Sequence, residues 1–389
     1  MVVSREVALG ELFDIGSSKR VFQSEWRNKG VPFYRAREIA KLASDGYVDN
    51  DLFIDEDLYV RYVKEYGKPM PGDIMVTGVG TLGVCYIVQD QDKFYFKDGN
   101  ILWFRAKNTD KVLSEFVVRA FDSDYVKDEI RKNSSGTTVG TFTIQTAKQL
   151  KIRLPSMPDQ RRIVDKLACV DKLILLRKKQ LEKLDQLVKS RFIELFGDLK
   201  TNPYGWECKN LLDVAEIDTV MVSDYEKYAD YPHIGIDGIE KNTGRLFGYR
   251  TIAEDGVISG KYLFTEKHII YSKIRPNLNK VALPDFDGLC SADAYPILPK
   301  ENICLRIYLG YVMRSEFFLD YILPFSRRAN MPKVNKEQLS GFVLPVPNIE
   351  LQQQFAAFVE QTEKSKLAIQ QSLDKLELLK KSLMQEYFG

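Results

Sequence analysis

The chain has 389 residues, which is enough for two or more domains that each bury a core. Hydrophobic residues make up 44% and charged residues 28%, as in an ordinary globular protein, and no apolar run approaches the roughly 18 residues that a membrane-spanning helix needs. The formal net charge is only +2, so bulk charge does not indicate a nucleic-acid partner, and any basic surface must be local.

Residues 1–154 predict a first globular domain of strands, turns and a helix. Strand-like runs flank a glycine turn at 72–88 and an Asp-Gly turn at 93–106, so we expect a hairpin in each stretch. Helical spacing follows at 113–132, and a loop of small residues follows at 134–142.

Residues 155–198 predict a single long helix. Ser156 and Asp159 match a capping box at its start, and Gly197 suits the left-handed residue that follows a helix. Apolar residues recur mostly at steps of three, four or seven, which indicates the seam of a coiled coil. The seam residues are Ile163, Leu167, Val170, Ile174, Leu181, Leu184, Val188, Phe192 and Leu195. A stripe of this length needs a partner helix of similar length.

The second half of the chain repeats the first. Residues 199–345 predict a second globular domain and residues 346–389 a second long helix, whose ending 373–389 repeats 181–197 at an offset of 192 residues. Its residues predicted for helix pairing or a partner interface are Leu373, Leu376 and Leu379. The globular elements correspond in order: 268–283 to 72–88, 290–299 to the end of 93–106, 305–323 to 113–132, and 326–335 to 134–142. We therefore expect two like helices that pair.

No catalytic constellation is recognisable. Gly78, Gly80 and Gly83 fit the G-x-G-x-x-G pattern of a dinucleotide or adenosyl-methionine site, but that site requires a helix after the last glycine, and the continuation here is strand-like. A glycine turn in a hairpin is the favoured interpretation. With two histidines and five scattered cysteines we expect no metal site and no catalytic residue, and the absence of a signal-peptide core favours a cytoplasmic protein.

Local basic and amide-rich loops are the candidates for binding DNA, since arginine and lysine contact phosphate and guanine and asparagine can pair with adenine. In the second globular domain they are Tyr271, Lys273, Arg275, Asn277, Asn279, Lys280, Arg327, Arg328, Asn330 and Lys333. In the first they are Lys19, Arg20, Arg35, Arg37 and Asn133, with the hydroxyls of Ser135 and Thr137. The alternative for each residue is an ordinary solvated loop.

Together these features resemble the specificity subunits of type I restriction–modification systems. The resemblance is carried by the Leu-Pro entries at 154–155 and 344–345, the Gln-rich runs that follow them, the duplicated helices and the stretch 271–283. It implies an α+β fold with two similar mixed α/β target recognition domains, separated by two long helices that pair as an antiparallel coiled coil with a pseudo-two-fold internal repeat.

The resemblance also implies function and partners. Each target recognition domain would read one half of a split, asymmetric double-stranded DNA site, and the helices would dock two modification (methyltransferase) subunits, which restriction (helicase–nuclease) subunits join. The chain itself would be non-catalytic and hold no cofactor, with S-adenosylmethionine on the modification subunits. Two alternatives remain: a coiled-coil adaptor that binds no DNA, and a cofactor-dependent enzyme that uses the glycines at 78–83.

Overall fold

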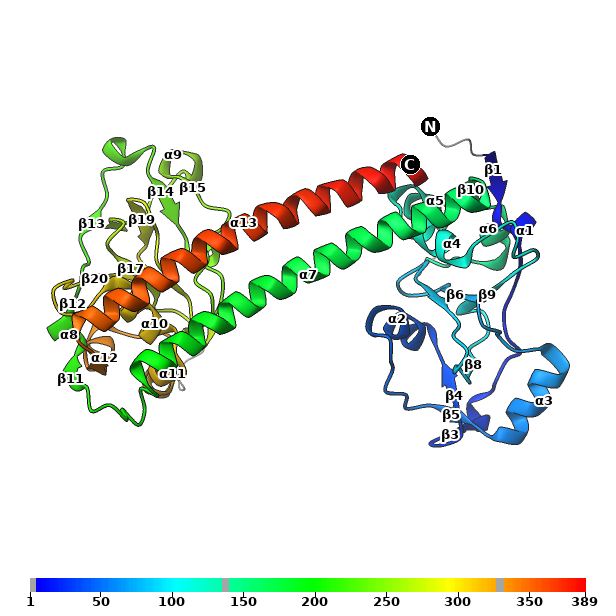
Figure 1. Cartoon of the computed structure of the whole chain (residues 1–389), viewed down its shortest axis with the longest axis horizontal. Helices are drawn as coiled ribbons and strands as arrows, with labels where there is room; N and C mark the ends of the chain where they lie inside the picture. The colour runs from blue at the N-terminus through cyan, green and yellow to red at the C-terminus, as the bar shows by residue number, and fades with distance from the viewer. Residues whose placement is uncertain (1–4, 135–139, 327–331) are drawn as a thin grey trace. The chain divides into compact units, whose positions relative to one another are not determined.

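The computed structural model describes residues 5–134, 140–326 and 332–389 (Figure 1). The chain divides into two compact units: unit 1 comprises Met1–Lys178 with Gln371–Gly389, and unit 2 comprises Lys179–Gln370. The long helices α7 (Met157–Phe196, green in Figure 1) and α13 (Ile349–Phe388, orange to red) each contribute residues to both units. Neither they nor any other helix in the described ranges is long and apolar enough to cross a membrane.

Unit 1 is built on a four-stranded antiparallel sheet in the order β2–β9–β6–β7. Helices α4 and α5 share a core with this sheet, in which Phe104 and Phe116 are fully buried. A smaller sheet has the order β3–β5–β4–β8 and lies near α2 and α3 in the chain. The strands are β2 (Phe13–Gly16), β3 (Trp26–Arg27), β4 (Val31–Tyr34), β5 (Phe53–Ile54), β6 (Ile74–Thr77), β7 (Cys85–Ile87), β8 (Tyr95–Phe96) and β9 (Ile101–Ala106). The helices are α2 (Ala36–Asp45), α3 (Glu56–Tyr66), α4 (Ser114–Phe121) and α5 (Asp124–Ser134).

Unit 2 has a matching sheet in the order β12–β20–β17–β18 and a five-stranded sheet in the order β13–β16–β19–β14–β15. Its main core joins the first sheet, α10 and α11 to aromatic side chains of the long helices. The strands are β12 (Ala215–Ile217), β13 (Met221–Val222), β14 (Pro232–Ile234), β15 (Arg250–Thr251), β16 (Lys261–Phe264), β17 (Ile269–Ser272), β18 (Val281–Ala282), β19 (Gly288–Ser291) and β20 (Ala294–Pro299). The helices are α9 (Ile252–Asp255), α10 (Arg306–Arg314) and α11 (Glu316–Ile322).

Each globular segment starts and ends in a two-stranded antiparallel sheet. In unit 1, β1 (Arg5–Ala8) pairs with β10 (Lys151–Leu154), which leads into α7. In unit 2, β11 (Glu207–Asn210) pairs with β21 (Val343–Val346), which leads into α13. Short helices flank these strands: α1 (Leu9–Leu12), α6 (Ile144–Gln149), α8 (Leu211–Val214) and α12 (Lys336–Ser340).

Two local predictions are corrected. The predicted hairpin at 93–106 does not form, because β8 pairs parallel with β4 in the smaller sheet while β9 pairs with β2 and β6 in the larger one. The single helices predicted at 113–132 and 305–323 are each two helices. At both breaks a serine hydroxyl donates to a helix carbonyl at 2.6 Å, Ser123 to Ala120 and Ser315 to Val312, and so competes with the main-chain ladder.

The antiparallel pairing of the long helices is confirmed within each unit. In unit 1 the contacts run from Lys166–Tyr387 (3.3 Å) through Asp171–Lys380 (2.7 Å) to Lys178–Glu377 (3.2 Å), so residue numbers rise along α7 as they fall along α13. In unit 2, Asp185 meets Lys366 at 2.5 Å and the rings of Phe192 and Phe355 lie 5.3 Å apart.

The predicted seam of α7 is buried or half-buried throughout, at Ile163, Leu167, Val170, Ile174, Leu181, Leu184 and Val188. On α13 the seam includes Leu373 and Leu376, whereas Leu379, predicted for helix pairing or a partner interface, is 45% exposed and does not pack in the seam. The next seam position is Lys380, whose ammonium group reaches Asp171 on α7. A leucine one position away from the seam faces solvent, however similar its sequence context is.

The internal repeat extends to individual contacts. The buried Gln160 side chain accepts from the Leu113 amide at 2.9 Å and donates to the carbonyls of Lys111 and Pro155, both at 3.0 Å. In unit 2, Gln352 makes the same three contacts, each 192 positions later: Leu305 (2.8 Å), Ile303 (3.1 Å) and Pro347 (2.8 Å). Similarly, Phe388 packs on Phe116 with ring centroids 5.1 Å apart, and Phe196 packs on Tyr308 at 4.8 Å.

Candidate nucleic-acid interface

The first candidate surface is the turn between β17 and β18 in unit 2. It contains the one-turn helix η4 (Pro276–Leu278), which begins with proline, a residue already fixed in a helical φ. The flanking residues Arg275 and Asn279 have positive φ values of 48° and 47°, an unusual conformation for residues other than glycine. The Arg275 amide donates to the Pro332 carbonyl at 2.9 Å, and the Asn279 side chain donates to the Arg314 carbonyl at 2.7 Å. These bonds fix the turn.

Main-chain bonds also bring the second candidate stretch to this turn. The Val334 amide donates to the Lys273 carbonyl at 2.8 Å, and Ile274 forms an isolated bridge with Lys333. The structure therefore joins 271–280 with 332–335 into one surface. Three further candidates, Arg327, Arg328 and Asn330, lie outside the described residues.

The cations of this surface differ in how far they are engaged. Burial and the nearby Lys333 lower the pKa of Lys273, against the opposing charge of Asp293, and its ammonium lies 4.9 Å from the Tyr295 ring centroid. Lys333 pairs with Asp293 at 3.2 Å, and Lys280 donates to the Ile236 carbonyl at 2.7 Å.

By contrast, Arg275 and Asn277 are exposed, and neither side chain has a partner among the described residues. A guanidinium and a carboxamide without intramolecular partners can form hydrogen bonds to DNA phosphates and to base edges. Of the predicted residues of unit 2, these two are the best placed to touch a ligand.

Two predicted contact residues are corrected because they are buried. Tyr271 is 1% exposed, its ring packs edge-on against Phe318 at 5.4 Å, and burial raises the pKa of its hydroxyl. Asn279 is 4% exposed and uses its amide to hold the Arg314 carbonyl. Both residues shape the turn from inside and cannot reach a ligand.

The equivalent place in unit 1 is the glycine turn between β6 and β7. The Gly78 amide donates to the Asn100 carbonyl at 2.8 Å and its carbonyl accepts from Phe142 at 2.9 Å, just as Lys273 bonds to Asp293 (3.0 Å) and Val334 in unit 2. A Cβ atom at Gly78 would lie 2.8 Å from the Phe142 carbonyl oxygen, so this close approach requires glycine. The turn continues into a strand and not into a helix, which argues against the dinucleotide fingerprint.

Three of the candidate DNA-contacting side chains of unit 1 already interact with other residues of that unit. The Lys19 ammonium lies 5.2 Å from the Tyr66 ring centroid, Arg20 pairs with Asp98 at 3.0 Å, and the Asn133 side chain donates to the Glu129 carbonyl. Ser135 and Thr137 lie outside the described residues.

Arg35 and Arg37 both hold Glu38, at 2.9 and 2.7 Å, and both also reach Asp51. Burial raises the pKa of the Glu38 carboxyl, but hydrogen bonds from the two arginines outweigh burial and keep that pKa below its usual value. Arg35 therefore serves mainly to bind Glu38 and Asp51. The Arg37 side chain makes the same contacts but remains 61% exposed.

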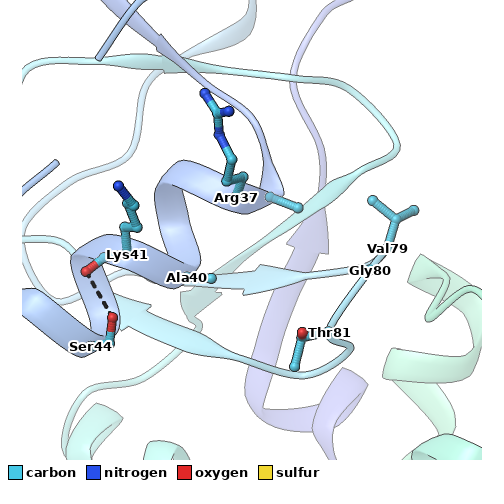
Figure 2. Close-up of a pocket in the computed structure, with 8 residues that line it drawn as sticks. Arg37, Ala40, Lys41, Ser44, Val79, Gly80 and Thr81 are labelled. Carbon is cyan, nitrogen blue, oxygen red and sulfur yellow. Dashed lines mark hydrogen bonds between the residues drawn. The ribbon is translucent and has the colours of Figure 1, made fainter. Parts of the chain in front are cut away.

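The sequence interpretation missed a hollow beside the glycine turn of unit 1, with a volume of about 440 Å³. Its wall on α2 includes Arg37 and Lys41, and its wall on the turn is formed by Val79, Gly80 and Thr81 (Figure 2). The spacing of Arg37 and Lys41 on one helical face was visible in the sequence, but their position opposite the turn was not. Among the described residues no group of three or more histidine, cysteine or acidic side chains could hold a metal ion.

Comparisons with known proteins agree with this architecture. The sequence profile of the type I restriction modification DNA specificity domain matches twice, at residues 2–186 and 203–378. The chain is 30% identical over 268 residues to the type I restriction enzyme EcoDI specificity subunit of Escherichia coli, which covers 60% of this chain and 59% of that protein. It is 22% identical over 273 residues to the MjaIX specificity subunit of Methanocaldococcus jannaschii, covering 64% and 62%. The alignments thus span about three-fifths of these relatives.

Solved structures share the fold over nearly the whole chain. The S subunit of a type I restriction–modification system from M. genitalium has a TM-score of 0.60 at 14% identity, covering 100% of this chain and 96% of its own. A chain from a structural study of complex assembly and conformational transition in the type I R-M system has a TM-score of 0.59 at 16% identity, covering 100% and 98%.

Proposed function

The chain belongs to the type I restriction–modification DNA specificity family, and from this premise we propose that it is the subunit that selects the DNA sequence for such a complex. Each unit reads one half of an interrupted site. Because the two globular segments differ in sequence, the two half-sites differ and the whole site is asymmetric. In unit 2 the bases are read at the β17–β18 turn.

The observation that carries this proposal is the equivalence of the two turns. The β6–β7 turn and the β17–β18 turn are held by the same pair of main-chain bonds, while their side chains are unrelated: glycines at one, and Arg275 with Asn277 at the other. A main-chain frame that occurs in both units and presents different side chains at one place suits two modules that contact different DNA half-sites there.

Replacing Arg275 by alanine is expected to weaken binding of the specific site by about 1–3 kcal/mol, the usual contribution of an arginine at a base edge. Arg275→Gly removes the same group while suiting the positive φ at this position, so both variants should lose affinity alike. Fluorescence anisotropy against duplexes with one altered half-site measures the loss. Lys267→Ala, an exposed lysine of unit 2 outside the turn, is the matched control.

Normal affinity and discrimination by both Arg275 variants would refute the assignment of this turn. The alternative function, a coiled-coil adaptor that binds no DNA, makes a different prediction. In that case the parent chain with its partners would show no sequence-dependent, salt-dependent binding at all.

The partners are proposed from the helices. Leucines at equivalent positions of α7 and α13 face solvent: Leu175 with Leu367, at 52% and 62% exposure, and Leu187 with Leu379, at 49% and 45%. Exposed leucines repeated on two like helices indicate two equivalent protein-binding surfaces. We propose that two modification subunits dock there, that restriction subunits join them, and that S-adenosylmethionine binds to the modification subunits and not to this chain.

Methyl transfer to DNA is therefore expected only when the chain and the modification subunits are mixed, with activity rising until two modification subunits are present per chain. The chain alone should transfer no methyl group and hydrolyse neither DNA nor ATP. Native mass spectrometry of the assembled complex gives the ratio, and labelled S-adenosylmethionine gives the activity. Methylation by the purified chain, or a complex with a single modification subunit at saturation, would contradict this assignment.

A further inference from the structure

The hollow in unit 1 has the composition of an anion site. Of the side chains that line it, only Arg37 and Lys41 are charged, and both are cationic. They lie one helical turn apart on α2 and line the same hollow as Val79, Gly80 and Thr81, and Figure 2 shows both side chains extending from α2 in a similar direction.

The two cations are prepared differently. The Arg37 Nε atom donates to Glu38, and its Nη2 atom forms an ion pair with Glu38 and donates to Asp51. These contacts hold the guanidinium in place and leave Nη1 without a partner among the described residues. The Lys41 side chain is exposed and its ammonium has no partner in the described ranges. The Arg37 guanidinium is therefore held in one orientation, whereas the Lys41 ammonium can move to contact an anion in the hollow.

The opposite wall is formed by the turn of Val79, Gly80 and Thr81. Within the described part of the chain, the amides of Val79, Gly80 and Thr81 donate to no carbonyl or side chain. The turn is nevertheless fixed, because the Thr77 hydroxyl donates to the Thr81 carbonyl and accepts from the Val84 amide at 3.0 Å. Gly80 has φ = 72°, and a Cβ atom there would meet nothing within 4 Å, so a ligand can approach the main chain closely. Successive free amides in a turn form a concavity that binds anions.

We propose that this hollow binds a phosphodiester of the DNA strand that passes the first recognition unit, with Lys41 and Arg37 on one side of the phosphate and the amides of the glycine turn on the other. The inference rests on the proposed function and deepens it. Phosphate contacts position a protein on the duplex without reading its sequence. Unit 1 thereby uses its glycine turn for the backbone, where unit 2 presents Arg275 and Asn277 at the equivalent turn.

The test uses the full chain assembled with its modification subunits and a duplex that contains the complete site. Lys41→Ala is expected to lower the affinity for specific and non-specific DNA by the same factor, and to reduce the slope of log K against log salt by about one. The ratio between specific and non-specific binding stays at the parental value. Ala40→Glu, which puts a carboxylate into the hollow, should weaken both kinds of binding further. Lys64→Ala, an exposed lysine on α3, is the control and should behave like the parent.

A second set of duplexes identifies the phosphate. Each duplex carries a neutral methylphosphonate in place of one phosphate of the first half-site. At one position the substitution should weaken binding by the parent but not weaken binding by Lys41→Ala any further, because the contact is already lost. A nucleoside monophosphate at millimolar concentration should not compete, since an isolated nucleotide lacks the rest of the duplex contacts.

Parental affinity and salt slope for both Lys41→Ala and Ala40→Glu, or additive effects at every methylphosphonate position, would overturn the proposal. Competition by the free nucleotide at the hollow would overturn it in favour of a nucleotide site. If Lys41→Ala and Ala40→Glu bind DNA like the parent while Arg275→Ala weakens binding, only the proposed phosphate site is refuted. If no variant, in either unit, alters binding of DNA, the proposed function fails with it.

Discussion

A fragment of residues 1–200 is expected to dimerise and, with the modification subunits present, to direct methylation to an inverted repeat of the first half-site. The fragment keeps one globular segment and α7, but it loses α13 and with it the cover of the α7 seam. An apolar seam that long does not remain exposed to water, so two copies of α7 should pair with each other. Two-fold symmetry of the protein then implies inverted half-sites on DNA.

The repeat explains why the second copy fits. In the full chain, Phe388 fills the core of unit 1 against Phe116. The fragment lacks Phe388, but Phe196 ends α7 in the same Phe-Gly sequence and packs on Tyr308, which stands 192 positions after Phe116. In the dimer, Phe196 of each copy can therefore occupy the place of Phe388 in the other.

Sedimentation equilibrium measures the dimer, and sequencing of methylated DNA identifies the site. Phe196→Asp is the control variant, because a charge at the end of α7 should abolish pairing while leaving the remaining residues of the core unchanged. A soluble monomer, or a dimer that still directs methylation to the original asymmetric site, would refute the internal repeat as the basis of function.

Gln352→Ala is expected to destabilise unit 2 by about 3 kcal/mol. The substitution leaves the Leu305 amide and the carbonyls of Ile303 and Pro347 without the partner that now satisfies them, at a site where the glutamine is fully buried. Each buried polar group without a partner costs about 1–3 kcal/mol, and some of the three will recover a bond to water.

Thermal and urea unfolding of the full chain measure the loss. Gln353→Ala removes an exposed glutamine at the next position of α13 and should leave the midpoint unchanged. Gln160→Ala should cause a similar loss in unit 1, since its three contacts are equivalent. Equal stability of Gln352→Ala and Gln353→Ala would show that this side chain does not join the helix to the globular segment.

The helices were predictable because their signal is periodic and long. A seam of nine apolar positions in 155–198, closed by a capping box and a glycine, leaves little freedom in the assignment. The hairpin at 93–106 failed for the opposite reason. An Asp-Gly turn reports only that the chain bends, and the strand before it joins β4, a partner some 60 positions earlier that no local pattern reveals.

The sequence indicated the two stretches that meet at the β17–β18 turn, but not which of their side chains are free of partners. Position 279 attracts attention as an asparagine in a basic loop, yet its carboxamide is used to hold the Arg314 carbonyl. Arg35 and Arg37 read as free cations, but Glu38 and Asp51 bind them once α2 forms. Lys41 looks like any surface lysine until the glycine turn is placed opposite it. The sequence identifies which polar and charged side chains are present, but tertiary contacts decide which of them already have hydrogen-bond or ion-pair partners.

The short sheets β1–β10 and β11–β21 have a consequence for how such proteins acquire new specificities. In each unit the first and last strands of the globular segment lie paired, with Arg5 opposite Leu154 and Glu207 opposite Val346. The chain thus enters and leaves each segment through one narrow stem. A foreign segment with the same stem, and with the residues that accept Gln160 and Phe388 or Gln352 and Phe196 of the long helices, can replace the resident one by exchange of a single continuous stretch of gene. Under the proposed function, such an exchange would replace one DNA-recognition surface in a single step and keep the paired helices.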